Sequence, residues 1–139
     1  MKTSFPYQQW DSVSLPMIPV SIDRVGTLYA IVDSGANVSL FQYEVAELLG
    51  IKLMQGRKIP LSGIGGKISG YLHTIRLEVG GHLFSCQVCF SKELRVPLNL
   101  LGRQDFFQQF RITFDESKKI VILDRSRNHP TRNSLSTGG

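Results

Sequence analysis

The 139-residue sequence predicts an all-β fold, a small closed barrel or a sandwich, with one or two short helices. Three observations predict it. Many short apolar stretches have the length and alternation of strands, glycines mark the turns between them, and little of the chain shows helical periodicity. The length fits one domain, and a composition of 42% hydrophobic and 19% charged residues is sufficient to bury a core.

The first strands are expected after an N-terminal extension, residues 1–14. MIPVSI (residues 17–22) and LYAIVD (residues 28–33) are apolar and rich in β-branched residues, and DRVGT between them has turn composition. The stretch YEVAELLG predicts a short helix, because Val45, Leu48 and Leu49 share one helical face and a glycine follows as a C-terminal cap.

The second half is expected to be rich in strands. Residues 72–79 alternate in the manner of a strand, and the turns around it are assigned to the glycines. These glycines are Gly63, Gly65, Gly66, Gly70, Gly80 and Gly81. RVPLNLLG is a further apolar run, RQDFFQQF predicts one or two helical turns, and RITFDESKKIVIL predicts a hairpin. Residues 124–139 are polar and are expected to form a disordered tail, which leaves residues 15–123 as the domain.

Charge and hydropathy limit the classes of binding partner that the sequence predicts. The net charge is +5, but the basic residues are scattered, so a solvated mixed surface is expected and no nucleic-acid partner. There is no apolar run of about 18 residues, so no membrane segment is expected. The first ten residues lack the apolar stretch of a secretory signal.

The two cysteines, Cys86 and Cys89, form a C-x-x-C motif that is typical of redox pairs and of half zinc sites. The nearest histidine, His82, lies in the same strand-like segment, and no second C-x-x-C exists. Positions three apart on a strand point to opposite faces, so the thiols converge poorly on a metal. We expect two free, packed cysteines, a reducing and therefore cytoplasmic location, and neither metal nor cofactor.

A carboxylate interrupts the apolar stretch AIVDSGANVSLF, residues 30–41. Asp-Ser-Gly is common turn chemistry, because Asp and Ser bond nearby backbone and Gly accepts positive φ. The alternative is that Asp33 is catalytic, since Ile31 and Val32 before it would anchor a tight turn in the core.

Three motifs together resemble the retropepsin-like aspartic proteases, the single-lobe relatives of pepsin. They are IVDSGA (residues 31–36), LSGIGGKISGY (residues 61–71) and LNLLGRQDFF (residues 98–107), and they cover residues 15–123 in the expected order. The resemblance implies a closed barrel of the acid-protease type and the activity of an aspartic-type endopeptidase, a hydrolase that acts by proteolysis on peptide or protein substrates.

The resemblance assigns Asp33 as the catalytic residue, with Ser34, Gly35 and Ala36 supporting it. The hydroxyl at the Ser34 position bonds to a partner loop in the family, and Gly35 can donate its N–H to the carboxylate. Ile64, Gly65 and Gly66 would form the tip of the substrate-binding hairpin called the flap.

Leu101, Gly102 and Arg103 match the segment that supports the active-site turn and the dimer in this family. The arginine there often binds an acidic residue four places after the catalytic aspartate, and this chain has Asn37 at that position. An arginine–amide bond is weaker than a charge pair, so Arg103 is expected to bind Asn37 weakly or to pair with Asp105 or another carboxylate.

Only one Asp-Ser-Gly exists, so a protease built from this chain must be a homodimer with Asp33 and its copy on the two-fold axis. Residues 1–14 are then a possible interface strand. Two alternatives stay open: a monomeric β-domain with an ordinary turn, and a non-proteolytic dimeric module that binds peptides on the same fold.

Overall fold

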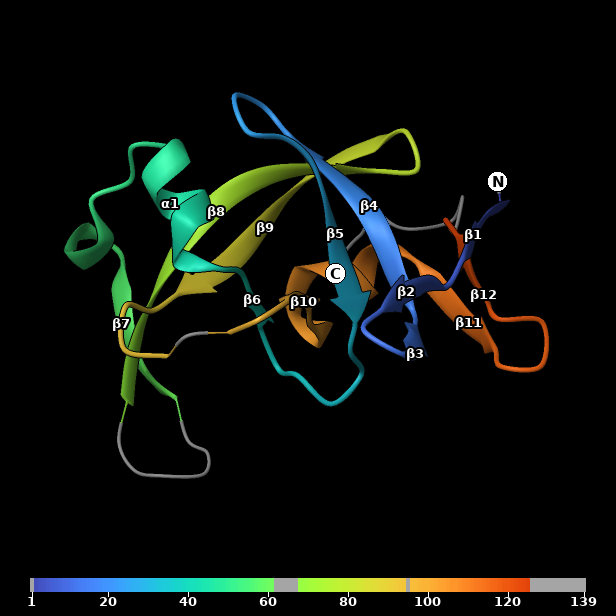
Figure 1. Cartoon of the computed structure of the whole chain (residues 1–139). Coiled ribbons are helices and arrows are strands. Elements are labelled where there is room, and N and C mark those ends of the chain that lie inside the picture. The colour runs from blue at the N-terminus through green and yellow to red at the C-terminus, as the bar shows by residue number, and fades with distance from the viewer. Residues whose placement is uncertain (1, 62–67, 95, 126–139) are drawn as a thin grey trace.

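The computed structural model describes residues 2–61, 68–94 and 96–125 (Figure 1). Its elements are β1 (Lys2–Pro6), β2 (Gln8–Trp10), β3 (Val13–Leu15), β4 (Met17–Ile22), β5 (Gly26–Val32), β6 (Ser39–Leu40), α1 (Tyr43–Leu48), η1 (Leu53–Gln55), β7 (Arg57–Leu61), β8 (Ile68–Val79), β9 (His82–Phe90), β10 (Asn99–Leu101), η2 (Arg103–Phe107), β11 (Arg111–Asp115) and β12 (Ile120–Asp124).

The main sheet closes into a barrel, as the sequence predicts. Its strand order is β4-β5-β10-β6-β9-β8-β7, and an additional pairing between β4 and β8 joins Ser21 to Glu78 and closes the ring. Most neighbouring strands are antiparallel, but β10 runs parallel to β5 and β6 runs parallel to β9. The chain therefore brings β10, from the second half of the sequence, beside the end of β5.

The two ends of the described chain share a second sheet. Strand β12 lies between β1 and β11 and is antiparallel to both, with Lys2 opposite Asp124. The predicted hairpin of residues 111–123 is thus confirmed as β11 and β12, and β12 continues to Asp124. A separate two-stranded hairpin, β2–β3, connects β1 to the barrel.

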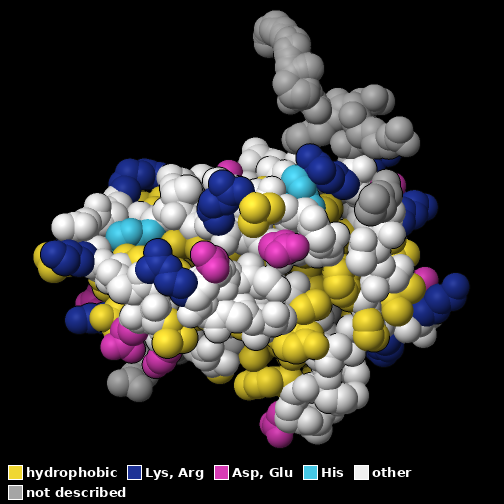
Figure 2. Space-filling model, turned by 90° about the horizontal axis from the view of Figure 1, so that it is seen from above, with side chains coloured by type: hydrophobic (Ala, Val, Ile, Leu, Met, Phe, Trp, Pro, Cys, Tyr) yellow, Lys and Arg dark blue, Asp and Glu magenta, His cyan; other side chains and the backbone are white. Residues whose placement is uncertain are grey.

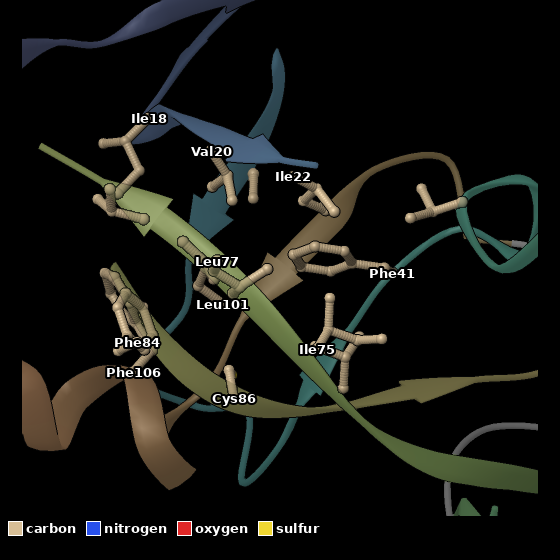
Figure 3. Close-up of a cluster of buried hydrophobic side chains, with 14 of the residues drawn as sticks. Ile18, Val20, Ile22, Phe41, Ile75, Leu77, Phe84, Cys86, Leu101 and Phe106 are labelled. Carbon is tan, nitrogen blue, oxygen red and sulfur yellow. The ribbon is translucent and has the colours of Figure 1, made fainter. Parts of the chain in front are cut away.

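The core fills the barrel with aliphatic and aromatic side chains (Figure 3). Ile18 and Val20 of β4, Leu77 of β8, Leu101 of β10 and Phe106 of η2 are completely buried. Strand side chains of alternate residues point inward, which is why β-branched and leucine residues repeat at every second position. Val32 at the end of β5 and Phe106 of η2 are therefore both anchored in one core.

Three local predictions are wrong. Gly70 lies within β8 and not in a turn. A glycine is required at that position of the strand, because a Cβ there would lie 2.3 Å from the Cys89 sulfur. Leu48 is 62% exposed, since Val45 and Ala46 occupy the buried side of α1. The alternation of β8 does not hold over its whole length, because Leu72 is buried together with Ile75 of the opposite face.

The surface carries mixed charge. In Figure 2 the Lys and Arg side chains are spread over the visible face among acidic and neutral ones, and they do not gather in one patch. Among the described residues, no helix combines the length and the apolar character needed to cross a membrane.

Candidate active site

Asp33 lies directly after β5, where the chain leaves the barrel. The Val32 N–H donates to the Pro16 carbonyl at 3.0 Å, and the Asp33 N–H donates to the Leu101 carbonyl at 3.0 Å. Val32 is buried and Ile31 is half-buried, so the strand end is fixed in the core on both sides. The loop that begins with Asp33 lies at the lower edge of the barrel in Figure 1.

The carboxylate of Asp33 is held by the backbone of its own turn. The Gly35 N–H donates to Asp33 Oδ1 at 2.9 Å, and the Ala36 N–H donates to the Asp33 carbonyl at 3.2 Å. Asp33 is half-buried, whereas Ser34 and Gly35 are exposed. The carboxylate is therefore oriented by one N–H and remains accessible, which is the state that a general base or acid requires.

Residues 101–104 lie against this turn from the other side. The Arg103 N–H donates to the Ala36 carbonyl at 2.8 Å, and the Gln104 N–H donates to the Asn37 carbonyl at 2.9 Å. The approach requires a glycine, because a Cβ on Gly102 would lie 2.5 Å from the Val38 carbonyl carbon and oxygen. The sequence motifs of residues 31–36 and 98–107 are thus brought into direct contact.

A buried hydroxyl fixes the same glycine. The Gly102 N–H donates to Ser39 Oγ at 3.0 Å, and Ser39 is completely buried at the start of β6. Sequence reasoning missed Ser39, because a serine in an apolar stretch carries no local signal of a partner 63 residues away.

Asp105 and Gln87 anchor η2 to β9 and were also missed as a pair. Asp105 Oδ2 accepts the Gln87 N–H at 2.7 Å, and Gln104 Nε2 donates to Gln87 Oε1 at 2.8 Å. Asp105 has φ of 69° and Gln104 is also non-helical, so the predicted helical turns begin irregularly. A non-glycine residue in the left-handed region is strained, and here the hydrogen bond to β9 offsets part of that strain.

Arg103 is exposed, and no ion pair among the described residues includes it. The expected pairing with Asp105 is therefore not seen, because that carboxylate is bonded to β9. Instead Arg103 borders a hollow of about 650 Å³ beside the Asp33 turn. The hollow is lined by Ser34, Asn37, Arg103, Gln104, Phe107 and Gln108.

The expected flap tip of Ile64, Gly65 and Gly66 lies outside the described residues. The strands that lead into it are described. β7 and β8 are antiparallel, with Leu61 opposite Ile68 and Pro60 opposite Ser69. Ser69 is also bonded on its other side, since its N–H donates to Glu93 Oε1 at 2.9 Å and its carbonyl accepts the Ser91 hydroxyl at 2.7 Å.

The two cysteines are free and completely buried in β9. Burial raises the pKa of Cys86 and of Cys89 to about 11, because a thiolate loses its hydration in the core. Cys86 Sγ contacts Ser39 Oγ at 3.7 Å, whereas Cys89 Sγ lies beside Gly70. Among the described residues, no cluster of His, Cys, Asp and Glu has the size of a metal site.

Comparisons with known proteins agree with this geometry. A sequence model of a family described as aspartyl protease matches residues 18–104. A search of curated proteins gives no significant match.

Two solved structures share the fold. A retropepsin-like aspartic protease from Rickettsia conorii is 19% identical, with a TM-score of 0.66 over 88% of this chain and 91% of that chain. The protease of EIAV, solved with the inhibitor HBY-793, is 20% identical, with a TM-score of 0.52 over 69% of this chain and 88% of that chain. The expected barrel of the retropepsin type is thereby confirmed.

Proposed function

The chain belongs to the aspartyl protease family, and on that premise we propose that it is an aspartic endopeptidase in which Asp33 and its copy in a homodimer activate water. The observation that carries the proposal is the accessible Asp33 carboxylate, held by the Gly35 N–H at the end of a core strand. Peptide hydrolysis by water needs a base for the water and an acid for the departing amine. Two carboxylates that share one proton supply both, as in the known aspartic protease dyad.

The need for a second chain follows from the count of motifs. The sequence contains one Asp-Ser-Gly, so the second carboxylate comes from another copy on a two-fold axis. Strand β1, which pairs with β12 in the same chain, is proposed to lie near that interface together with the rest of its sheet.

The roles proposed for the neighbouring residues follow from their contacts. Gly35 orients the carboxylate through its N–H, and Ser34 is exposed beside it, where its hydroxyl can bond to the second copy. The Leu101 carbonyl accepts a hydrogen bond from the Asp33 N–H. Gly102 allows its segment to approach the Asp33 turn closely. The antiparallel pair β7–β8 is proposed to lead into the segment that covers an extended peptide substrate.

A non-proteolytic peptide-binding dimer is the second candidate. It uses the same barrel and hairpin, and it differs only in whether Asp33 cleaves the bound peptide. The intact Asp-Ser-Gly turn favours the protease, because a binding module has no need for an accessible carboxylate on the axis.

The test is Asp33→Asn in the full chain, assayed for cleavage of a random peptide pool by mass spectrometry. The amide cannot exchange the proton, so we expect cleavage to be lost while circular dichroism and the melting temperature stay close to wild type.

Each result of this test separates the two candidates. If wild type and Asp33→Asn bind peptides equally and neither cleaves them, the binding module is the correct function. If Asp33→Asn cleaves at the wild-type rate, Asp33 belongs to an ordinary turn and the proposed catalytic role is wrong. Glu47→Gln on the exposed side of α1 removes a carboxylate outside the site and serves as the matched control.

A further inference from the structure

A buried serine and an exposed glutamate hold the start of β8 at the point where β9 no longer accompanies it. The pairing of β8 with β9 ends at Tyr71, which lies opposite Phe90. Beyond that point, in the described part of the chain, residues 68–70 pair only with residues 59–61 of β7, and these residues form a two-stranded ribbon. A ribbon of two strands is marginally stable in water, so its orientation depends on what else holds it.

Ser69 is the residue of this ribbon that needs a further partner. It lies opposite Pro60, which has no N–H, and both backbone groups of Ser69 bond away from β7. The Ser69 N–H donates to Glu93 Oε1 at 2.9 Å, and the Ser69 carbonyl accepts the Ser91 hydroxyl at 2.7 Å. Two side chains therefore make the hydrogen bonds that a third strand would otherwise make.

The loop that carries these two side chains is itself fixed by Ser91. The Glu93 N–H and the Leu94 N–H both donate to Ser91 Oγ at 3.2 Å. Ser91 is 3% exposed, so burial as well as hydrogen bonding holds its hydroxyl in place. In Figure 1 the loop that follows β9 lies beside the β7–β8 pair. Ser69, Ser91 and Glu93 are called the clasp below.

We propose that Ser91 and Glu93 are positioning residues for the substrate, because they fix the orientation of the two-stranded ribbon against the barrel. The proposal rests on the proposed function, which assigns peptide binding to the segment that β7 and β8 lead into. It deepens that function by naming two residues that determine how tightly the peptide is bound.

The place of the clasp in the fold predicts which kinetic constant it controls. Asp33 is held by the Gly35 N–H and the Leu101 carbonyl, and neither bond involves a clasp residue. A ribbon that is less well held therefore binds the peptide more weakly but does not move the Asp33 carboxylate. An interaction made equally in the bound substrate and in the transition state changes KM and leaves kcat unaltered.

The experiment removes the Glu93 carboxylate and then restores an acceptor, using a peptide that wild type cleaves from a random pool. Glu93→Ala should raise KM about fivefold, the factor that corresponds to one net hydrogen bond, with kcat within about twofold of wild type. Glu93→Gln keeps an oxygen that accepts the Ser69 N–H, so its KM should lie close to wild type.

The matched control is Glu78→Ala. Glu78 is an exposed carboxylate on the same strand, and its side chain forms no hydrogen bond in the described part of the chain. Its removal should leave both KM and kcat at the wild-type values.

Ser91→Ala tests whether the two side chains act through the same residue. It should raise KM with little change in kcat. The double variant Ser91→Ala, Glu93→Ala should raise KM by less than the product of the two single effects, because both side chains hold Ser69. Effects that multiply would overturn this common action through Ser69.

Two further results would overturn the proposal. A wild-type KM in Glu93→Ala means that the orientation of the ribbon does not depend on this carboxylate. Equal losses in Glu93→Ala and Glu93→Gln, or a fall in kcat without a rise in KM, assign Glu93 a role other than holding the Ser69 N–H.

Amide hydrogen exchange separates a failure of this proposal from a failure of the proposed function. Exchange of the Ser69 N–H, followed by NMR, needs no catalysis and should be about tenfold faster in Glu93→Ala than in wild type. If wild type cleaves no peptide, a labelled peptide pool is titrated against the Asp33→Asn chain with and without Glu93→Ala. Weaker binding with Glu93→Ala, together with faster exchange, supports the clasp without proteolysis. Equal binding overturns it, whatever the exchange rate.

Discussion

At the scale of single residues, Gly102 controls the contact between the two halves of the candidate site. A methyl group on it would lie 2.5 Å from the Val38 backbone, which cannot move without displacing the Asp33 turn. We expect Gly102→Ala to lower the free energy of unfolding by about 2–3 kcal/mol, the usual cost of overpacking. Urea unfolding measures this, and cleavage should fall with it.

The control for Gly102→Ala is Gly70→Ala, because the atom that an added methyl group would meet at position 70 belongs to a side chain and not to the backbone. A methyl group on Gly70 meets Cys89 Sγ at 2.3 Å, so Cys89→Ala should restore part of the stability that Gly70→Ala loses. No equivalent second mutation exists for Gly102. A Gly102→Ala chain as stable and as active as wild type would contradict the proposed contact.

The two buried thiols give a stability prediction at alkaline pH. Burial raises the pKa of Cys86 and of Cys89 from 9.0 to about 11. Below pH 9 both thiols are protonated in the folded and the unfolded chain, so their contribution is fully present. As pH rises from about 9 to 11, the unfolded chain loses these protons first, so stability falls by about 2 kcal/mol per thiol.

Urea unfolding between pH 8 and pH 11 is the measurement, with a double Cys86→Ala, Cys89→Ala variant as the comparison. That variant has lower stability throughout because of the space left in the core, but its decline over this range should be shallower. Equal slopes for the two proteins would show that the thiols do not lose hydration on folding.

At the scale of elements, the strands and the Asp33 turn were predictable because their signals are local. β4 has the predicted bounds, and the predicted second strand is found as β5, which starts two residues earlier. The irregular start of η2 was not predictable, because the left-handed Asp105 is held by Gln87, far away in the sequence.

Gly70 and Leu48 show the same limit. A glycine in a glycine-rich stretch predicts a turn. At position 70, however, glycine is needed because a larger side chain would collide with the Cys89 sulfur of the neighbouring strand. Leu48 fits the helical face, but the core needs only two residues of a helix this short. In both cases a contact in the folded protein determines the environment of the residue, and the adjacent residues in the sequence do not indicate that contact.

Asn99 joins three elements and gives the prediction at this scale. It is 5% exposed, its Oδ1 accepts the Gln42 N–H before α1 at 2.8 Å, and its Nδ2 donates to the Tyr29 carbonyl of β5 at 3.2 Å. Asn99→Leu leaves both backbone groups without this partner, so we expect a loss of about 3 kcal/mol in urea unfolding.

The control is Asn37→Leu, because Asn37 is exposed and its side chain forms no hydrogen bond with another residue in the described part of the chain. It should change the free energy of unfolding by less than about 0.5 kcal/mol. Equal losses for the two variants would mean that the bonds of Asn99 do not hold β5, β10 and α1 together.

At the scale of the whole molecule, one barrel supplies one Asp33 turn, so the proposed activity depends on assembly. Specific activity should therefore fall when the chain is diluted below its dimer dissociation constant, because activity follows the dimer fraction. Sedimentation over the same concentrations measures that fraction. Full activity at concentrations where only monomer sediments would contradict the dimer.

Subunit mixing tests the shared site more directly. When wild type is held constant and Asp33→Asn chains are added in excess, most wild-type chains enter mixed dimers that hold one Asp33 carboxylate. Such a dimer cannot provide both the base and the acid, so activity should fall as the inactive chain is added. The Glu47→Gln chain, which keeps its own Asp33, should not reduce activity when added in the same excess. If Asp33→Asn is equally harmless after time for exchange, each chain carries a complete site and the two-fold arrangement is wrong.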